Sequence, residues 1–569
     1  MHRTRTTTDR APHRKRAYGP ARPSAARHTR RRARRLMDRI GLVPLRRTIP
    51  RAAWTSKASR VIPPLGAIVY HRAAFGPAPG DIDAFEALGS TDAARIEAWV
   101  DRQLDPDSIP DTELEARIAA SNFTTLNKTL QQQWTDHWLP DDIDWNERFR
   151  PMLETQAAVF LRTVYSRRQL FEVMVGFWHD HFNIYGWHDE AGPVFGHWDR
   201  EVIRANALGN FRTMLEDVTA ATAMLFYLDN VYNEKDGPNE NYAREVMELH
   251  TMGEENYMGA IPAASVPLGP GGAPVAYVDE DVREMARCLT GWSVNEDTGE
   301  FLYRDGWHDT GAKHVLGLDI PANLAPLEDV RRVLDRLATH PGTARHIATK
   351  LCRRLLADDP PESLVESVAG IFLENASAPD QIARVVRAIL VSPEFAATWG
   401  EKVKRPFELV ISAMRTMNPD FTMDLAEDMT WWLLWLVSET GHAPFEWRPP
   451  TGYPDTRETW LGANPLVGNW RMINWLTDMR YPSGTGPYRF DVYAATPGNL
   501  RTSEELADYW IERCLGRPMD PADRRIVVEF MAQGHLPDLD IGIATDEEVQ
   551  NRLRTMVGLI LTSPDAILR

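Results

Sequence analysis

The chain has 569 residues and 43% hydrophobic content, enough for a sizeable core and for two or more domains. The formal net charge is −16, but residues 1–60 hold 19 Lys and Arg against 2 Asp, so the remainder carries −33. An acidic body of this kind argues against nucleic-acid binding by the main domain.

Residues 1–60 are predicted to form a basic, disordered arm, because they combine high positive charge with little apolar content. The arm could contact an acidic surface such as nucleic acid or lipid, and the plainer alternative is a solvated tail. The arginine pairs in residues 30–35 suggest a twin-arginine export signal, yet no apolar run of about 7–15 residues follows them. We therefore expect a cytoplasmic protein.

Helical periodicity dominates the body over residues 61–569, and strand-like alternation is scarce. Helices are expected over residues 81–103, 111–128, 145–165, 167–182, 202–215 and 219–228, and then over 239–253, 279–290 and 328–339. A Pro- and Gly-rich loop at 260–276 is expected to be flexible, and the less regular segment at 292–325 could form short strands. No apolar run is long enough to cross a membrane. The predicted fold is mainly α, a multi-helical array.

The C-terminal part contains an internal duplication. A helix bearing Cys352 is followed by a proline-bearing turn, a second helix and a Ser-Pro dipeptide, and the same order follows Cys514. Residues 345–398 and 505–569 are therefore expected to be two related helical units on one scaffold. These cysteines and Cys288 have no C-x-x-C spacing, so they are expected to be buried free thiols.

The most informative segment is residues 239–253, which is predicted to form one capped helix. Asn239 suits the N-cap and Gly253 suits the C-terminal stop. His250 falls in the middle of the apolar face. The opposite face is dense in acid, amide and guanidinium groups, namely Glu240, Asn241, Arg244, Glu245 and Glu248. This composition indicates a role beyond packing.

The helix at 167–182 likewise carries His181 in the centre of an apolar face that includes Trp178. Two imidazoles at equivalent places on two helices indicate a shared polar centre. It could be a divalent metal site completed by His308, since imidazole suits Zn, Fe, Cu or Ni. The alternative, which we favour slightly, is a histidine–carboxylate network that fixes the register of the helices.

Glu245 and Glu248 could form a second, harder-ligand site for Mg, Mn or Ca, because residues three apart share a helix face. His250 lies about 140–160° around the helix from both, at about 100° per residue, and cannot join them. The plainer interpretation pairs Arg244 with Glu240 and Glu248 on an exposed face. If that face is buried, Asp281 is an expected partner for Arg244.

The loop at 308–313 holds the best catalytic candidates outside the helices. His308 could be a general base or metal ligand, Asp309 its partner and Lys313 an anion-binding group. The alternative is an ordinary turn, since Asp309 is a common turn residue. His340 is expected to end the helix at 328–339, where a partly positive imidazole suits the carbonyl end.

These segments together resemble the signature of the bacterial DUF1800 family. Residues 239–253 resemble its N-E-N-(aromatic)-A-R-E-x-x-E-L-H-T-x-G motif, 178–182 its W-x-x-H-F, 286–292, with Arg287, its A-R-x-L-T-G-W, and 308–313 its H-D-x-G-x-K. Residues 402–408 and 449–454 resemble its K-x-K-x-P-x-E and P-P-x-x-G-W-P segments, although Tyr453 replaces the usual Trp.

The resemblance runs from about residue 65 to the C-terminus and implies an all-helical fold without an established activity. Relatives often look exported, which makes export the alternative to the cytoplasm. They are also frequently encoded beside DUF1501 proteins, and a protein of that type is the partner that the resemblance implies.

Two hypotheses follow. The first is an enzyme with a histidine- or metal-centred site built from His181, His250 and the loop of His308 and Asp309, with hydrolysis or oxidation as its chemistry. The second is a non-catalytic helical scaffold or binding protein, whose motifs hold the helices in register. Convergence of the imidazole and carboxylate groups in a solvent-reachable cleft favours the enzyme. Their dispersal, or their complete burial without a cavity, favours the scaffold.

Overall fold

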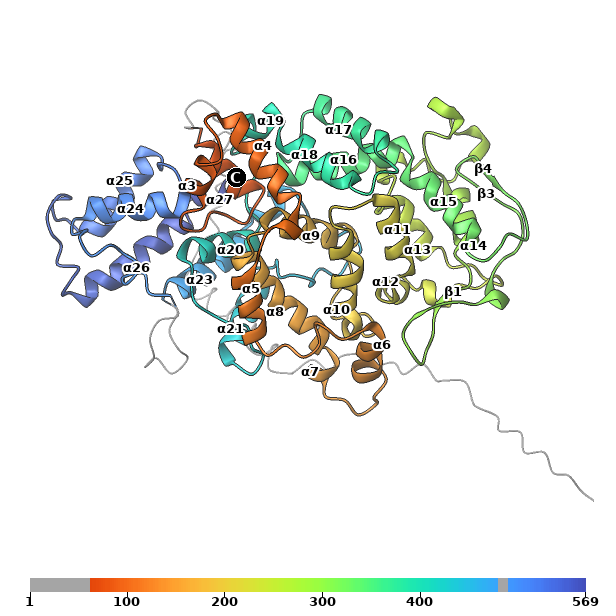
Figure 1. Cartoon of the computed structure of the whole chain (residues 1–569), viewed down its shortest axis with the longest axis horizontal. Helices are drawn as coiled ribbons and strands as arrows, with labels where there is room; N and C mark the ends of the chain where they lie inside the picture. Colours follow the sequence, from red (N-terminus) through yellow and green to blue (C-terminus); the bar gives the residue numbers. More distant parts are fainter. Residues whose placement is uncertain (1–61, 479–489) are drawn as a thin grey trace, which may run out of the picture. The chain divides into compact units, whose positions relative to one another are not determined.

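Helices form nearly all of the regular structure, as the sequence predicts (Figure 1). The computed structural model describes residues 62–478 and 490–569, so the basic arm lies outside the described residues. The N-terminal half contains α2 (Leu65–Arg72), α3 (Asp81–Glu86), α4 (Asp92–Gln103), α5 (Thr112–Ala120), α6 (Leu130–Gln133), α7 (Trp145–Arg148), α8 (Arg150–Tyr165), α9 (Gln169–His181), α10 (Phe195–His197), α11 (Phe211–Ala220), α12 (Thr222–Tyr227), α13 (Glu240–Glu248) and α14 (Asp279–Cys288).

The C-terminal half is helical to its end. It contains α15 (Glu328–Ala338), α16 (Pro341–Leu355), α17 (Glu362–Glu374), α18 (Gln381–Leu390), α19 (Pro393–Ala397), α20 (Pro406–Met417), α21 (Asp428–Ser438), α22 (Arg457–Trp460), α23 (Ala463–Thr477), α24 (Ser503–Leu515), α25 (Pro521–Ala532), α26 (Glu547–Leu561) and α27 (Pro564–Ile567). The series α16–α19 and α24–α27 follow the same order, and the last helix of each begins after a serine N-cap with proline at its first position.

The segment between α14 and α15 forms two small antiparallel hairpins. Strand β1 (Trp292–Val294) pairs with β2 (Phe301–Tyr303), and β3 (Lys313–Val315) pairs with β4 (Leu318–Ile320). The short strands expected within 292–325 are therefore present. Of the described residues, no helix is both long and apolar enough to cross a bilayer.

Several predicted helices have different boundaries. The helix expected at 81–103 is divided into α3 and α4, and the helix expected at 111–128 ends with α5 at Ala120. The helix expected at 145–165 is divided into α7 and α8. The helix expected at 202–215 is wrong, because Trp198–Arg204 forms a π-helical turn and α11 starts only at Phe211. Asn210 causes this restart, since its side chain accepts hydrogen bonds from the backbone N–H groups of Arg212 and Thr213. The helix predicted at 239–253 ends at Glu248, and the residues after it form a wide turn.

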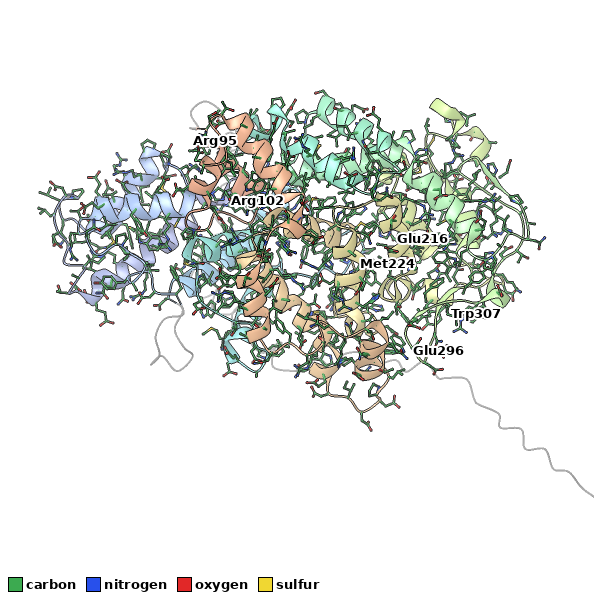
Figure 2. All side chains as sticks on the ribbon, in the orientation of Figure 1. Arg95, Arg102, Glu216, Met224, Glu296 and Trp307 are labelled. Carbon is green, nitrogen blue, oxygen red and sulfur yellow. The ribbon has the colours of Figure 1, made fainter. Side chains whose placement is uncertain are left out.

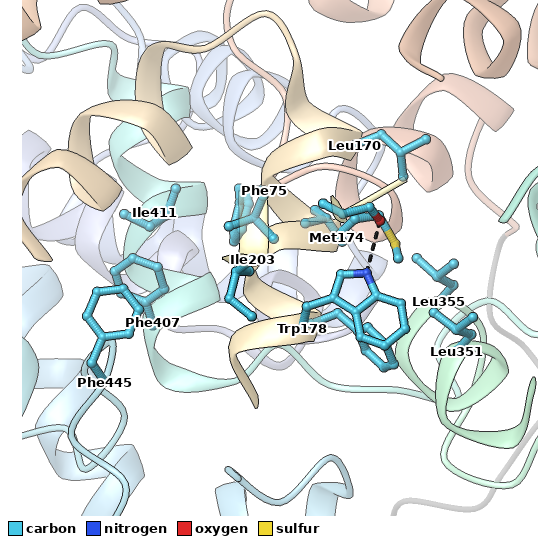
Figure 3. Close-up of a cluster of buried hydrophobic side chains, with 14 of the residues drawn as sticks. Phe75, Leu170, Met174, Trp178, Ile203, Leu351, Leu355, Phe407, Ile411 and Phe445 are labelled. Atoms are coloured by element: carbon cyan, nitrogen blue, oxygen red, sulfur yellow. Dashed lines mark hydrogen bonds between the residues drawn. The ribbon is translucent and has the colours of Figure 1, made fainter. Parts of the chain in front are cut away.

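Trp178 lies in the centre of the core (Figure 3). Its indole N–H donates to the carbonyl of Ala207 at 2.9 Å, the dashed line in that view, so its one polar atom is satisfied. Figure 3 also shows Leu351 and Leu355 of α16 beside it. The helix that ends at His181 is thus packed against α16, which contributes further residues to the site described below.

Exposed ion pairs tie neighbouring helices together on the surface. Glu216 of α11, labelled in Figure 2, accepts from Arg331 of α15 at 2.9 Å and pairs with Arg212 of its own helix at 2.8 Å. Such exposed pairs contribute only about 0–1 kcal/mol each. They orient α11 against α15 without dominating stability.

A buried cluster of three arginines surrounds a single carboxylate. Glu408, near the start of α20, forms ion pairs with Arg354 of α16, with Arg405 at 3.1 Å and with Arg569 at 3.1 Å, and all four side chains are almost completely buried. Burial alone would raise the pKa of Glu408, but the arginines hold it well below its usual range. The cluster joins α16, α20 and the last residue of the chain.

Replacing Glu408 with Gln should therefore be strongly destabilising. Removal of one partner leaves buried guanidinium charges uncompensated, which costs about 3–5 kcal/mol. Urea denaturation of Glu408→Gln measures this loss, and Glu374→Gln, at the exposed end of α17, serves as the matched control with a change within about 0.5 kcal/mol. A loss for Glu408→Gln below about 1 kcal/mol would contradict the importance of this cluster.

Candidate functional site

Three separate segments of the chain bring their histidines together. His181 is the last residue of α9, His250 lies in the turn after α13, and His346 lies on α16. The ring centroid of His181 is 6.2 Å from that of His250 and 6.3 Å from that of His346. The structure therefore brings His181 and His250 together and adds an imidazole that had no place in the sequence prediction. We call His181, His250, His346 and Lys350 the signature cluster.

Most imidazole nitrogens of this cluster have no hydrogen-bond partner. His181 Nε2 donates to the backbone carbonyl of His250 at 3.1 Å, and His346 Nδ1 donates to Glu255 at 2.9 Å. Within the described part of the chain, His181 Nδ1, both nitrogens of His250 and His346 Nε2 are buried without a partner. Since most buried polar atoms in proteins are hydrogen-bonded, four such atoms on three adjacent rings indicate a function other than stability.

The two deepest histidines are neutral. Burial lowers the pKa of His181 well below its ordinary value and that of His250 to about 3, and the positive charge of Lys350 lowers both further. Aromatic rings enclose His250, with Phe182 at 5.0 Å and Tyr242 at 6.0 Å between centroids. A neutral imidazole offers one N–H donor and one lone-pair acceptor, so the unpartnered atoms can exchange a proton.

Lys350 supplies a positive charge beside these rings. Its side chain is half-buried on α16, four residues after His346, and no hydrogen bond or ion pair to it occurs within residues 62–478 and 490–569. Burial lowers its pKa, while the negative charges of Asp455 and Asp180 raise it. An ammonium group without a direct partner can bind an anionic or carbonyl oxygen.

Acidic and phenolic groups border the cluster on the α13 side. The hydroxyl of Tyr277 is buried without a partner in the described structure, and the charges of Glu248 and Glu255 contribute to raising its pKa. Burial and the charge of Glu248 raise the pKa of Glu245 to about 6. A carboxyl group with a pKa near neutrality can both donate and accept a proton under ordinary conditions.

A second polar group adjoins the signature cluster, and it contains Asp180, the residue before His181. Asp180 accepts from Arg405 at 2.6 Å, and burial raises its pKa despite that partner. Gly452 packs on Asp180, because a Cβ at this left-handed position (φ +70°) would lie 1.8 Å from the Asp180 carbonyl oxygen. Asp180 and Arg405 line a cavity of about 70 Å³ together with His442 and Tyr453. The glycine and tyrosine of the segment at 449–454 thus shape the wall of this cavity.

His308 belongs to a different group of residues. Its Nε2 donates to Asp329 at 3.1 Å and its Nδ1 to the carbonyl of Thr290 at 2.8 Å, and Lys313 donates to the same Asp329 at 2.9 Å. Burial lowers the pKa of His308, but these two hydrogen bonds outweigh it and raise the pKa above its ordinary value. The predicted pairing with Asp309 is wrong, since Asp309 pairs with Arg287 at 2.7 Å.

The metal site suggested for His181, His250 and His308 is not formed by these described residues. Among residues 62–478 and 490–569, no group of three or more His, Cys, Asp or Glu side chains is placed to hold a metal ion. The proposed set of His181, His250 and His308 fails because His308 bonds to Asp329 and Thr290. Cys288, Cys352 and Cys514 are buried and free, as expected.

The polar face of α13 holds the surrounding loops. Asn239 caps the helix by accepting from the N–H of Asn241 at 2.9 Å, and both asparagine side chains donate to Asp229. Arg244 pairs with Glu240 at 3.4 Å, as expected, and with Asp279 at 3.4 Å.

Two predictions for residues on this side of the structure are wrong, one about the partner of Arg244 and one about the helix that His340 caps. Arg244 pairs with Asp279 and not with Asp281, because the Asp281 carboxylate accepts from the N–H groups of Val278 and Leu316. His340 begins α16 and does not end α15. Its Nδ1 accepts from the N–H of Gly342 at 3.0 Å and its Nε2 donates to the carbonyl of Pro274 at 2.8 Å. Burial lowers its pKa, so it is neutral and not partly positive.

The family of the chain is established by comparison of its sequence. Residues 68–568 match the model of the family described as "Protein of unknown function (DUF1800)", so the chain belongs to this family. Neither the curated proteins nor the solved structures contain a significant match. The signature segments that define the resemblance are the ones that supply His181 and His250.

Sequence reasoning missed two members of the signature cluster, His346 and Lys350, and the neighbouring Glu255 and Tyr277. A signal existed for the first pair, because His346 and Lys350 are four residues apart and therefore share a face of α16. Glu255 and Tyr277 lie outside regular helices, and no local pattern would have placed them there.

The unpartnered state of His250 predicts an unusual response to substitution. Replacing His250 with Leu removes two unsatisfied polar atoms from a fully buried site and should leave the protein equally stable or about 1 kcal/mol more stable. In contrast, His181→Leu removes the donor to the His250 carbonyl and should cost about 1–3 kcal/mol. Urea denaturation of both variants tests this order, and a large loss for His250→Leu would show that its nitrogens are bonded in the folded state.

The raised pKa of Glu245 predicts that its carboxyl group destabilises the folded protein as the pH rises. A carboxyl group with a pKa of about 6 in the folded state and an ordinary value of 4.5 when unfolded favours the protonated form, so folding loses stability as the pH rises from about 4.5 to 6. Above pH 6, Glu245→Gln should therefore be more stable than the wild type, by about 1 kcal/mol after allowance for partial exposure. Below pH 4.5 this difference should disappear. Chemical denaturation at pH 4 and pH 8 measures it, and an unchanged difference between the two would contradict the assignment.

Proposed function

We propose that the protein is an enzyme that binds an anionic substrate group at Lys350 and transfers a proton through the imidazoles of the signature cluster. The single observation that carries this proposal is the set of buried, unpartnered imidazole nitrogens on His181, His250 and His346, beside which Lys350 lies on the same helix face as His346. Buried polar atoms that are not needed for stability are most common at sites of catalysis or binding.

Each residue has a role that its environment supports. Lys350 lies beside neutral rings and binds a carboxylate, phosphate or carbonyl oxygen of the substrate. His346 is the most accessible of the three imidazoles, with 14% of its side chain exposed, and its Nδ1 is held by Glu255. This leaves Nε2 of His346 as the atom that exchanges a proton with the substrate, in the manner of a carboxylate-oriented general base.

The two inner histidines, His181 and His250, support the binding of the anion at Lys350. His181 is oriented by its hydrogen bond to the carbonyl of His250, and burial removes Lys350 from bulk water. Desolvation of this kind strengthens the interaction of the ammonium group with an anion.

The second candidate function is a non-catalytic helical scaffold, which would include the DUF1501-type partner suggested by the family. The observation that favours it is the complete burial of His250, which allows no direct contact with a substrate in this conformation. The two candidates predict different effects of a substitution at Lys350. The enzyme would lose turnover, whereas the scaffold would change only in its fold.

A test uses the full-length protein and a defined panel of small carboxylates and phosphate esters, followed by mass spectrometry of substrate loss. The proposal predicts turnover of at least one panel member, which Lys350→Met and His346→Gln reduce by at least about 100-fold, the range of a general acid–base contribution. The matched controls are Lys235→Met and His314→Gln, which replace exposed residues outside the cluster. Equal turnover by Lys350→Met and Lys235→Met would contradict the proposed centre, and no turnover or thermal shift with any panel anion would favour the scaffold.

A further inference from the structure

A patch of solvent-exposed indole rings lies on two neighbouring helices away from the signature cluster. Trp431, Trp432 and Trp435 project from α21, and Trp470 projects from α23 beside Val467. Their exposed fractions range from 36% to 57%. Large exposed apolar patches on a folded protein mark surfaces that bind something. We call these five residues the tryptophan patch.

The helix that carries most of the patch is apolar on all sides. From Met429 to Val437 every residue of α21 except Thr430 is hydrophobic, and Leu433, Leu434, Leu436 and Val437 are buried on the inner side. A helix without a polar face is suited to an apolar environment on its outer side as well as its inner side. With 11 residues, α21 is far shorter than the ~20 residues needed to span a bilayer, so it can only lie along a membrane surface.

The chemistry of the patch favours the headgroup region of a bilayer. Indole rings combine an apolar body with one N–H donor, and they concentrate at the membrane–water boundary. In the described structure the Trp432 and Trp435 rings meet edge to face at 5.3 Å, which leaves aromatic surface open to the outside. A rigid aromatic surface of this kind also binds quaternary ammonium groups through cation–π attraction.

The charges around the patch agree with a zwitterionic lipid that carries such a headgroup. Asp428 and Glu439 are exposed at the two ends of α21. Among the described residues, Arg471 lies beside the patch, where it pairs with Glu439 at 3.9 Å and lies 5.8 Å from the centre of the Trp435 ring. A local charge that is neutral to acidic attracts choline-type headgroups and gives no attraction to anionic lipid.

We propose that the tryptophan patch docks the protein onto a bilayer surface of zwitterionic phospholipid, with the indole rings at the headgroup level and α21 parallel to the membrane plane. The inference is independent of the proposed catalytic centre, because it uses none of its residues. A bilayer accounts better than a protein partner for three exposed indoles on an apolar helix with acidic groups at its ends, together with a fourth exposed indole on the neighbouring helix.

The test is flotation of the full-length protein with phosphatidylcholine vesicles, which avoids the attraction of the basic N-terminal arm to anionic lipid. We expect the wild type to float with the vesicles and its tryptophan fluorescence to shift to shorter wavelength. The triple variant Trp432→Ser, Trp435→Ser, Trp470→Ser should bind at least about tenfold more weakly. Trp431 is left in place because its indole N–H donates to the carbonyl of Leu425.

Two further variants provide controls. Ile526→Ser and Leu559→Ser remove exposed apolar side chains elsewhere on the surface and should bind vesicles like the wild type. If the triple variant fails to fold, as judged by circular dichroism, the single variants Trp432→Ser and Trp470→Ser replace it, and each should weaken binding measurably.

Three outcomes would overturn the proposal. One is absence of wild-type binding to phosphatidylcholine, and another is binding that the tryptophan substitutions do not change. The third is self-association in analytical ultracentrifugation that the triple variant abolishes while vesicle binding is absent, which would assign the patch to a contact between copies of the chain.

Discussion

Burial of ionisable side chains without full pairing is the constraint on which the account of the site depends. Where a buried charge has partners, as Glu408 has in its three arginines, it joins helices and stabilises the fold. Where buried imidazoles have none, as at His250, the fold gains nothing from their polarity and keeps them neutral. Glu408 and His250 both come from the segments that resemble the family signature.

Helix content and the general layout could be predicted from the sequence, because periodicity and capping are local properties. The short strands near β1 and β3 and the repeated helix order of the C-terminal part follow from the same signals. The errors occurred where a cap or a turn interrupts the helical periodicity. Asn210 restarts a helix that periodicity alone extends, and the turn after Glu248 places His250 beyond the helix and not on its face.

The site was predictable only in part. The positions of His181 and His250 on apolar faces indicated that their rings could meet, and the structure places them 6.2 Å apart. The spacing of His346 and Lys350 places both on one face of α16, but nothing local to that helix indicates that this face meets His181 and His250, which come from distant parts of the chain. His308 shows the converse, since a loop histidine next to an aspartate suggested a pair, but a distant carboxylate, Asp329, binds it.

The most direct measurement is the protonation state of the imidazoles in the intact protein, by nitrogen-15 NMR of histidine-labelled wild type with His181→Gln and His250→Gln for assignment. The account predicts that His181 and His250 stay neutral from pH 8 down to pH 5, because burial and the charge of Lys350 lower their pKa values. Protonation of either ring near its ordinary pKa of 6.5 would contradict it, since that would require bonded, solvated or ion-paired nitrogens in place of the unpartnered centre.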